Sequence, residues 1–180
     1  EEKRQRAPQH KHPQLPTPAE MKRCLDPYVI GQEGAKQTLT VAMYEHLQAL
    51  AAYDAHHQQP DFVPLPKNNI LLFGPTGCGK TYLLKRISQL IKVPFLTVNA
   101  PAYVPTGYKG TNLEYILTEL VAKTGDVQTA ERSVIFLDEM DKRAIRPGMS
   151  SSDAAFNAEF QHDLLKMVEG ATYDVDGENL

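Results

Sequence analysis

Apolar residues recur at every third or fourth position in several long segments of this chain. That spacing is typical of helices that bury one face and expose the other. It predicts helices over residues 33–52, 80–91, 111–124 and 156–168, with a loop over 54–68. In the longest of these helices, the repeating apolar positions are Ala35, Leu39, Ala42, Met43, Leu47 and Leu50.

Two capping boxes and two glycines mark where helices begin and end. Residues 17–20 (TPAE) form an N-terminal capping box and predict a short helix that ends near Asp26. Residues 111–114 (TNLE) repeat the pattern at the start of the third long helix. Gly125 and Gly170 are expected to stop the helices before them, because glycine readily adopts the left-handed conformation of a helix C-terminus.

Three short runs of consecutive apolar residues alternate with the helices, at 69–73, 95–98 and 133–137. A run that is apolar at every position predicts a strand covered on both faces, as in a parallel sheet. Strands that alternate with helices predict a three-layer α/β domain. This domain is expected to cover residues 17–180, after a flexible tail of residues 1–16.

The composition excludes several classes of protein. The 180 residues include 19 Lys and Arg against 22 Asp and Glu, which gives a formal net charge of −3. A charge this close to zero gives no reason to expect nucleic acid as a partner. No apolar run approaches the roughly 20 residues that a membrane-spanning helix needs. Cys24 and Cys78 lack the close spacing of a zinc motif, and two cysteines are too few for a disulfide scaffold.

Residues 74–81 (GPTGCGKT) satisfy the phosphate-loop pattern G-x-x-x-x-G-K-[ST], also known as Walker A. The glycines let backbone amides wrap a polyphosphate, and the following helix directs its free N–H groups at that charge. Lys80 is expected to reach the β- and γ-phosphates of ATP, and the Thr81 hydroxyl to hold Mg²⁺. Cys78 is either a small residue tolerated in the loop or a redox-sensitive thiol. The positions expected to contact nucleotide are Pro75, Thr76, Gly77, Cys78, Gly79, Lys80, Thr81 and Tyr82.

A second motif ends the third predicted strand. Residues 134–139 (VIFLDE) are four apolar residues followed by two acids, the Walker B pattern. Asp138 is expected to hold Mg²⁺, and Glu139 to polarise the water that attacks the γ-phosphate. The motif alone is a weak signal, but downstream of the phosphate loop it predicts hydrolysis of ATP or GTP, with Lys80 and Glu139 as catalytic residues. Its neighbours Asp141 and Lys142 are expected to be surface charges.

With these motifs in this order, residues 17–170 resemble the AAA+ ATPases of the Clp/Hsp100 type. Four stretches carry the resemblance: residues 17–36, 69–81, 107–124, and 126–142 with the sequence LLKMVEG beyond it. The resemblance implies a P-loop NTPase fold, a three-layer α/β/α arrangement that this chain would contain in part.

The resemblance also implies roles for individual positions. Val29 and Ile30 would line the adenine pocket, although from the residues alone they could equally be core. Residues 107–110 (GYKG) would form a pore loop in which Tyr108 and Lys109 contact a polypeptide substrate. The family's loops usually carry an apolar residue where Lys109 stands, so the grip or the substrate preference is expected to differ.

The activity that the resemblance implies is ATP-driven protein unfolding by a hexameric ring, with ATP and Mg²⁺ as cofactors. Unfolded or tagged proteins would pass to a ClpP-like peptidase in the cytoplasm or, alternatively, the mitochondrial matrix. No membrane or nucleic acid is expected as a partner. Two other interpretations stay open: a non-catalytic ATP-binding remnant that caps a ring of intact subunits, and an AAA+ motor that acts on nucleic acid.

In the family's sheet, a further strand lies between the strand before the phosphate loop and the Walker B strand. The chain is therefore expected to be a truncated piece in which two strand edges have no neighbour. Each unsatisfied buried backbone group costs about 1–3 kcal/mol, so the isolated chain is expected to be unstable and to turn over ATP poorly. The acidic segment 171–180 is not expected to fill the gap.

Overall fold

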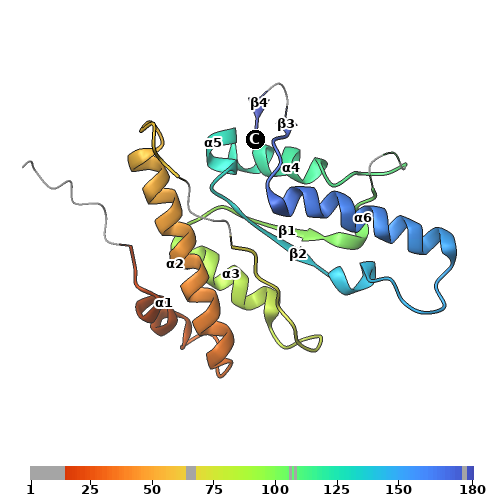
Figure 1. Cartoon of the computed structure of the whole chain (residues 1–180). Helices are drawn as coiled ribbons and strands as arrows, with labels where there is room; N and C mark the ends of the chain where they lie inside the picture. Colours follow the sequence, from red (N-terminus) through yellow and green to blue (C-terminus); the bar gives the residue numbers. More distant parts are fainter. Residues whose placement is uncertain (1–14, 64–67, 106, 108, 176–177) are drawn as a thin grey trace, which may run out of the picture. The chain divides into compact units, whose positions relative to one another are not determined.

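The computed structural model describes residues 15–63, 68–105, 107, 109–175 and 178–180 (Figure 1). The chain divides into two compact units, Glu1–Ile70 and Leu71–Leu180. Among the described residues, the first unit holds two helices, and the second holds a parallel sheet, a small hairpin and the remaining helices.

The first unit is a pair of packed helices, α1 (Pro18–Leu25) and α2 (Glu33–His56). The predicted capping box is confirmed: the Glu20 amide donates to Thr17 Oγ1 at 3.3 Å, and the Thr17 amide donates to Glu20 Oε2 at 2.8 Å. α1 packs on α2 and buries two apolar side chains, Met21 and Leu25.

α2 continues four residues beyond the predicted end, into the segment expected to be a loop. No glycine or proline interrupts residues 53–57, and the His57 amide completes the last turn by donating to the Tyr53 carbonyl at 2.9 Å. The imidazole of His57 stacks on the Tyr53 ring with centroids 4.8 Å apart. The helix therefore ends shortly before Pro60, the first residue that cannot donate a backbone hydrogen bond.

The second unit is built on two parallel strands, β1 (Phe95–Asn99) and β2 (Val134–Asp138). The register pairs Phe95 with Val134 and Asn99 with Asp138. The connection runs through a short 3₁₀ helix, η1 (Ala100–Ala102), and then through α4 (Tyr115–Thr124) and α5 (Val127–Ala130). Parallel strands joined by a helical crossover confirm the predicted α/β class.

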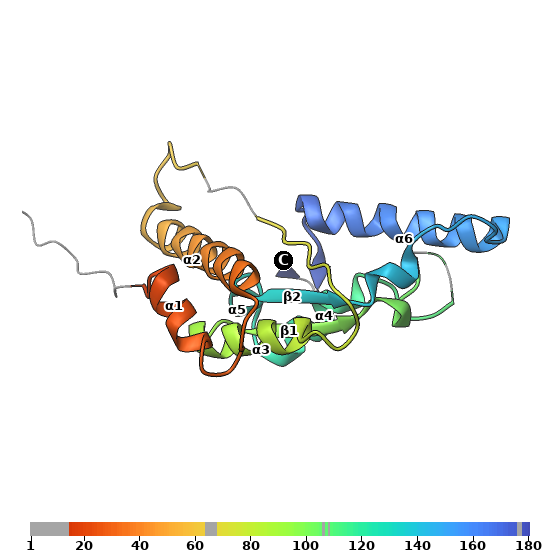
Figure 2. The same ribbon diagram turned by 90° about the horizontal axis from the view of Figure 1, so that it is seen from below.

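Helices pack on both sides of this sheet, with α3 (Lys80–Ile91) and α6 (Ser151–Glu169) on opposite sides (Figures 1 and 2). The expected inner face of α3 is buried at Leu83, Leu84 and Ile87. Apolar side chains of β1, α4, α5 and α6 meet in one core. Its buried members are Leu96, Val98, Ala100, Tyr103, Leu113, Ile116, Leu120, Ala130 and Phe160.

The predicted strand at 69–73 is wrong. These residues form no strand, and the side chains of Leu71 and Phe73 are 71% and 85% exposed. A strand is stable only where a neighbour supplies hydrogen bonds. In the described residues β2 pairs with β1 alone, and residues 69–73 join neither strand. For the same reason β2 is half-buried along its length rather than covered on both faces.

The helix expected over 111–124 begins four residues late, at Tyr115. The predicted cap by Thr111 is not formed, and Asn112 Oδ1 in the preceding turn accepts from the Tyr115 amide at 3.2 Å. The Thr111 carbonyl instead accepts from the Val104 amide at 2.9 Å, which draws residues 111–112 away from the helix. Gly125 caps the C-terminus as predicted, with a φ of 93°.

α6 and the segment beyond it agree only partly with the predictions, since the helix begins at Ser151, five residues before the predicted start, where Ser150 caps it. Gly170 stops the helix as predicted, with a φ of 93°. The acidic segment that follows stays outside the β1–β2 sheet but forms a small antiparallel hairpin, β3 (Asp174–Val175) with β4 (Glu178–Asn179). Val175 is buried, and the hairpin packs against α4.

Candidate active site

The phosphate loop lies between residues 71–73 and the first turn of α3. Its glycines are required by the backbone: Gly77 and Gly79 have φ angles of 81° and 89°, which favour glycine strongly. A Cβ at Gly74 would lie 2.9 Å from Cys78 Sγ, so a larger residue would displace the cysteine. Gly79 caps α3 without a side chain, so backbone amides rather than a side-chain oxygen face the loop at this helix end.

The Lys80 ammonium is folded over this loop. Its Nζ donates to the carbonyl oxygens of Gly74 at 2.8 Å and Pro75 at 3.0 Å, and it lies 3.8 Å from Cys78 Sγ. These contacts hold a positive charge above the backbone amides, at the place where a polyphosphate is expected. Tyr82 points elsewhere, because its hydroxyl accepts from Arg86 Nε one turn along α3 at 3.1 Å.

The structure brings the two expected Mg²⁺-holding residues into contact. Thr81 Oγ1 on the first turn of α3 donates to Asp138 Oδ2 at the end of β2, at 3.2 Å. The residues are far apart in sequence and meet because α3 packs against β2. A hydroxyl and a carboxylate side by side are hard oxygen ligands of the kind that Mg²⁺ prefers, so these residues fit the ion.

Glu139 follows directly and has a strained backbone. Its φ of 60° places a non-glycine residue in the left-handed region, which costs about 1–3 kcal/mol and is common at functional sites. Its amide donates to Asp138 Oδ1 at 2.9 Å, so the two acids are held together. The Glu139 carboxylate pairs with Lys142 Nζ at 2.8 Å and raises the pKa of that lysine. Lys142 is thus a partner of the predicted base.

The remaining predicted site residues belong to the first unit or to the segment 107–110. Val29 and Ile30 belong to the first unit, where Val29 is buried and Ile30 is 93% exposed. Lys109 lies exposed in a bend, and Tyr108 lies outside the described residues. In the described part of the chain, no cluster of three histidine, cysteine or acidic side chains could hold a metal ion on its own.

Comparison with known protein families assigns the chain that carries this phosphate loop and these two acidic residues to a family. The sequence pattern described as "ATPase family associated with various cellular activities (AAA)" matches residues 70–178, more than half of the chain. The chain belongs to the AAA ATPase family. The match covers the phosphate loop, Asp138 and Glu139 together, and it agrees with the expected resemblance.

Curated relatives of this AAA ATPase carry the name "ATP-dependent Clp protease ATP-binding subunit ClpX". The chain is 41% identical over 167 residues to the Porphyromonas gingivalis protein, covering 92% of this chain and 40% of the relative. It is 43% identical over 162 residues to the Azotobacter vinelandii protein, covering 88% of this chain and 37% of the relative. The chain therefore spans well under half the length of these relatives.

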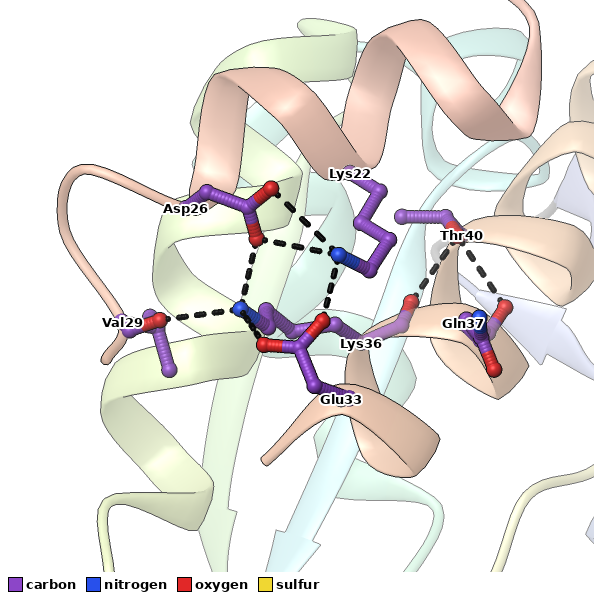
Figure 3. Close-up of polar contacts among 7 residues, drawn as sticks. All are labelled: Lys22, Asp26, Val29, Glu33, Lys36, Gln37 and Thr40. Carbon is purple, nitrogen blue, oxygen red and sulfur yellow. Dashed lines mark hydrogen bonds and ion pairs between the residues drawn. The ribbon is translucent and has the colours of Figure 1, made fainter. Parts of the chain in front are cut away.

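The first unit of the AAA chain contains a charge cluster that the sequence analysis missed (Figure 3). Lys36 has a side chain only 2% exposed, and its Nζ contacts Asp26 Oδ1 at 2.6 Å, Glu33 Oε1 at 2.7 Å and the Val29 carbonyl at 3.1 Å. Lys22 joins the same two carboxylates. The sequence did indicate that Lys36 is buried, because helical spacing places it on the same face of α2 as the buried residues 39, 40 and 43.

This cluster determines the charge states of its members. Hydrogen bonds from Lys36 lower the pKa of Asp26, and those from Lys22 and then Lys36 lower the pKa of Glu33. The carboxylates in turn raise the pKa of Lys36, with Asp26 contributing most. All four side chains are therefore charged at neutral pH, and they tie α1 to the start of α2.

Replacing Lys36 by methionine is expected to lower the melting temperature of the protein at neutral pH. The variant leaves the Val29 carbonyl and two carboxylates with fewer donors. Because the carboxylate pKa values are lowered in the folded state, their stabilisation is present above about pH 4 and is lost as the pH falls further. Melting curves at pH 7 and pH 3 should show a difference between wild type and variant that shrinks in acid.

Gln37→Met is the matched control for this prediction, since Gln37 is the exposed neighbour of Lys36 on the same helix. It should melt like the wild type at both pH values. Equal melting of Lys36→Met and wild type at neutral pH would show that the cluster adds nothing to stability.

Within the part of the chain that the structure describes, every helix is too short or too polar to pass through a lipid bilayer.

Proposed function

We propose that this chain is the ATP-binding and ATP-hydrolysing part of a protein unfoldase subunit. The observation that carries the proposal is the 3.2 Å contact between Thr81 Oγ1 and Asp138 Oδ2. It joins the phosphate loop to the acidic end of β2, so the nucleotide-holding and water-activating residues can act on one γ-phosphate. Neither motif alone would support hydrolysis.

Each residue of the site has a distinct part in this proposal. The backbone amides from Thr76 to Gly79 bind the phosphate oxygens, and Lys80 exchanges its loop carbonyls for the β- and γ-phosphates. Thr81 and Asp138 would hold Mg²⁺, which neutralises phosphate charge when bound.

Glu139 acts as the general base. To accept a proton from the attacking water, its carboxylate has to release Lys142, with which it is paired at 2.8 Å. The side chain is 40% exposed, so water can reach it. The Glu139 amide remains hydrogen-bonded to Asp138 Oδ1, which keeps the base beside the ion-holding residue.

The unfolding activity and the partners are proposed from the relatives' name, which describes an ATP-binding subunit of a Clp protease. We infer that the full-length protein forms a hexameric ring in the cytoplasm and threads unfolded or tagged proteins to a ClpP-like peptidase. Tyr108 and Lys109 would contact the polypeptide, and Val29 and Ile30 would contact the adenine.

Replacing Tyr108 by alanine in the full-length protein is expected to spare ATP hydrolysis and to abolish unfolding of a tagged fluorescent protein. The aromatic ring would supply contact with the substrate chain and take no part in the chemistry. Loss of fluorescence and release of inorganic phosphate, measured on the same sample, separate the two activities.

Tyr115→Ala is the control for this experiment, because Tyr115 is an exposed tyrosine on α4 outside the loop. It should unfold the fluorescent protein at the wild-type rate. Unfolding by Tyr108→Ala at the same rate would remove Tyr108 from the mechanism while leaving the ATP site intact.

A further inference from the structure

Arg143 is buried immediately beyond the acidic end of β2, at the end of the 3₁₀ helix η2 (Met140–Arg143). Its residue surface is only 9% exposed. The guanidinium stacks over the rings of Phe156 at 5.0 Å and Phe160 at 4.6 Å, both on α6. Among the described residues it has no carboxylate partner, and burial lowers its pKa.

Two of the three guanidinium nitrogens, Nε and Nη2, donate to backbone carbonyls of one short segment, whereas Nη1 donates to Asn157 Oδ1 on α6 at 3.5 Å. Nη2 donates to Ala100 at 3.3 Å and Pro101 at 3.0 Å, and also to the carbonyl of Tyr103. Nε makes a further contact with the Ala100 carbonyl at 3.4 Å. A rigid, planar fork of donors suits this task, and a lysine could not reproduce it.

The residues that Arg143 contacts begin a loop, and the two sides of this loop are hydrogen-bonded to each other. The Val104 amide donates to the Thr111 carbonyl at 2.9 Å, and Val104 forms a bridge with Asn112. A Cβ at Gly110 would lie 2.9 Å from Val104 Cγ1, so the two sides are in close contact. We call residues 100–104 and 110–112 the loop base. A shift of Arg143 would move this base as one piece.

η2 therefore carries two neighbouring basic side chains with different partners. Lys142 pairs with the Glu139 carboxylate, and Arg143 holds the loop base. Gln161 Nε2 on α6 donates to the Arg143 carbonyl at 2.8 Å, so the helix turn also has a fixed support. When Glu139 releases Lys142 to act on water, η2 loses its ion pair with Glu139 while Arg143 keeps its hydrogen bonds to the loop base.

We propose that Arg143 is a positioning residue that couples the nucleotide site to the loop base. The coupling rests on the proposed function in one respect, namely that Glu139 exchanges Lys142 for water during hydrolysis. Such coupling requires an element with two arrangements. In this proposal the element is η2, with Lys142 either paired with Glu139 or released from it.

The test is amide hydrogen exchange of the loop base in the full-length protein, with ADP and with a non-hydrolysable ATP analogue. In the wild type, exchange of these amides should differ between the two nucleotides. In Arg143→Lys the difference should disappear, while ATP affinity and basal ATP turnover stay within about twofold of wild type. Arg146→Lys is the matched control, an exposed arginine three residues on, and it should keep the difference.

Lys142→Ala provides a second test if Arg143→Lys does not fold, because Lys142 is exposed and its removal breaks the other end of the link. It too should abolish the nucleotide-dependent difference in exchange. A wild-type protein that hydrolyses ATP with no such difference, or variants that retain it, would overturn the coupling. A wild type that neither binds nor hydrolyses ATP would instead refute the proposed function.

Discussion

Replacing Glu139 by glutamine is expected to leave ATP bound but unhydrolysed. Glutamine keeps the size and hydrogen bonding of the side chain but cannot accept a proton from water. General-base catalysis contributes roughly 10²- to 10⁴-fold in rate, so the turnover number should fall by about that factor. ATP affinity should stay near the wild-type value, because Glu139 does not belong to the phosphate loop. Phosphate release and nucleotide binding, measured in parallel on the full-length protein, test both statements.

Asp141→Asn is the control for this variant. Asp141 is a neighbouring acid whose side chain is 80% exposed, and its nearest ion partner is Arg146 at 4.0 Å. Its removal should leave the turnover number unchanged. Normal turnover by Glu139→Gln would show that another group activates the water, and the assignment of the base would be wrong.

The second large effect is expected from Lys80→Ala, which should weaken ATP binding severely. The variant removes the side-chain cation that donates to the Gly74 and Pro75 carbonyls of the phosphate loop. A hydrogen bond to a charged group contributes about 1.5–3 kcal/mol, so each lost contact should raise the dissociation constant by about ten- to a hundredfold. Titration with a fluorescent ATP analogue measures the loss directly.

Lys85→Ala removes an exposed lysine from the same helix, beyond the first turn, and serves as the matched control. It should bind ATP like the wild type, since Lys85 lies outside the phosphate loop sequence 74–81. Equal affinities of wild type and Lys80→Ala would mean that these residues do not form the nucleotide site.

The phosphate loop could be predicted from the sequence because its requirements are local. Glycines at 77 and 79 are needed for a left-handed backbone, and the helix that begins at Lys80 follows from the apolar spacing of its residues. The parallel pairing of β1 and β2 followed from two apolar runs separated by a helix. The roles of Lys80 and Glu139 in catalysis remain predictions.

The predictions that proved wrong concern segments whose secondary structure depends on a partner elsewhere in the chain. Residues 69–73 are as apolar as β2, but a strand needs a neighbour, and apolar spacing alone cannot show whether one is available. The helix at 111–124 lost its first turn because Thr111 pairs with Val104, a contact that a capping pattern does not encode.

Two buried basic residues, Lys36 and Arg143, were missed for a related reason. Charged residues are expected on the surface, and only a set of compensating contacts makes their burial tolerable. For Lys36 the helical spacing carried a signal, because the lysine falls on the buried face of α2. For Arg143 no periodic pattern exists, since its carbonyl partners lie about forty residues earlier in the chain.

The measurement that tests the central claim most directly is ATP binding and ATP turnover on one preparation of the full-length wild-type protein. The account predicts that ATP binds, that phosphate is released catalytically, and that EDTA stops the release because Thr81 and Asp138 then lack their ion. Binding of ATP without turnover in the presence of Mg²⁺ would contradict it, and would identify the protein as a non-catalytic nucleotide-binding member of the family.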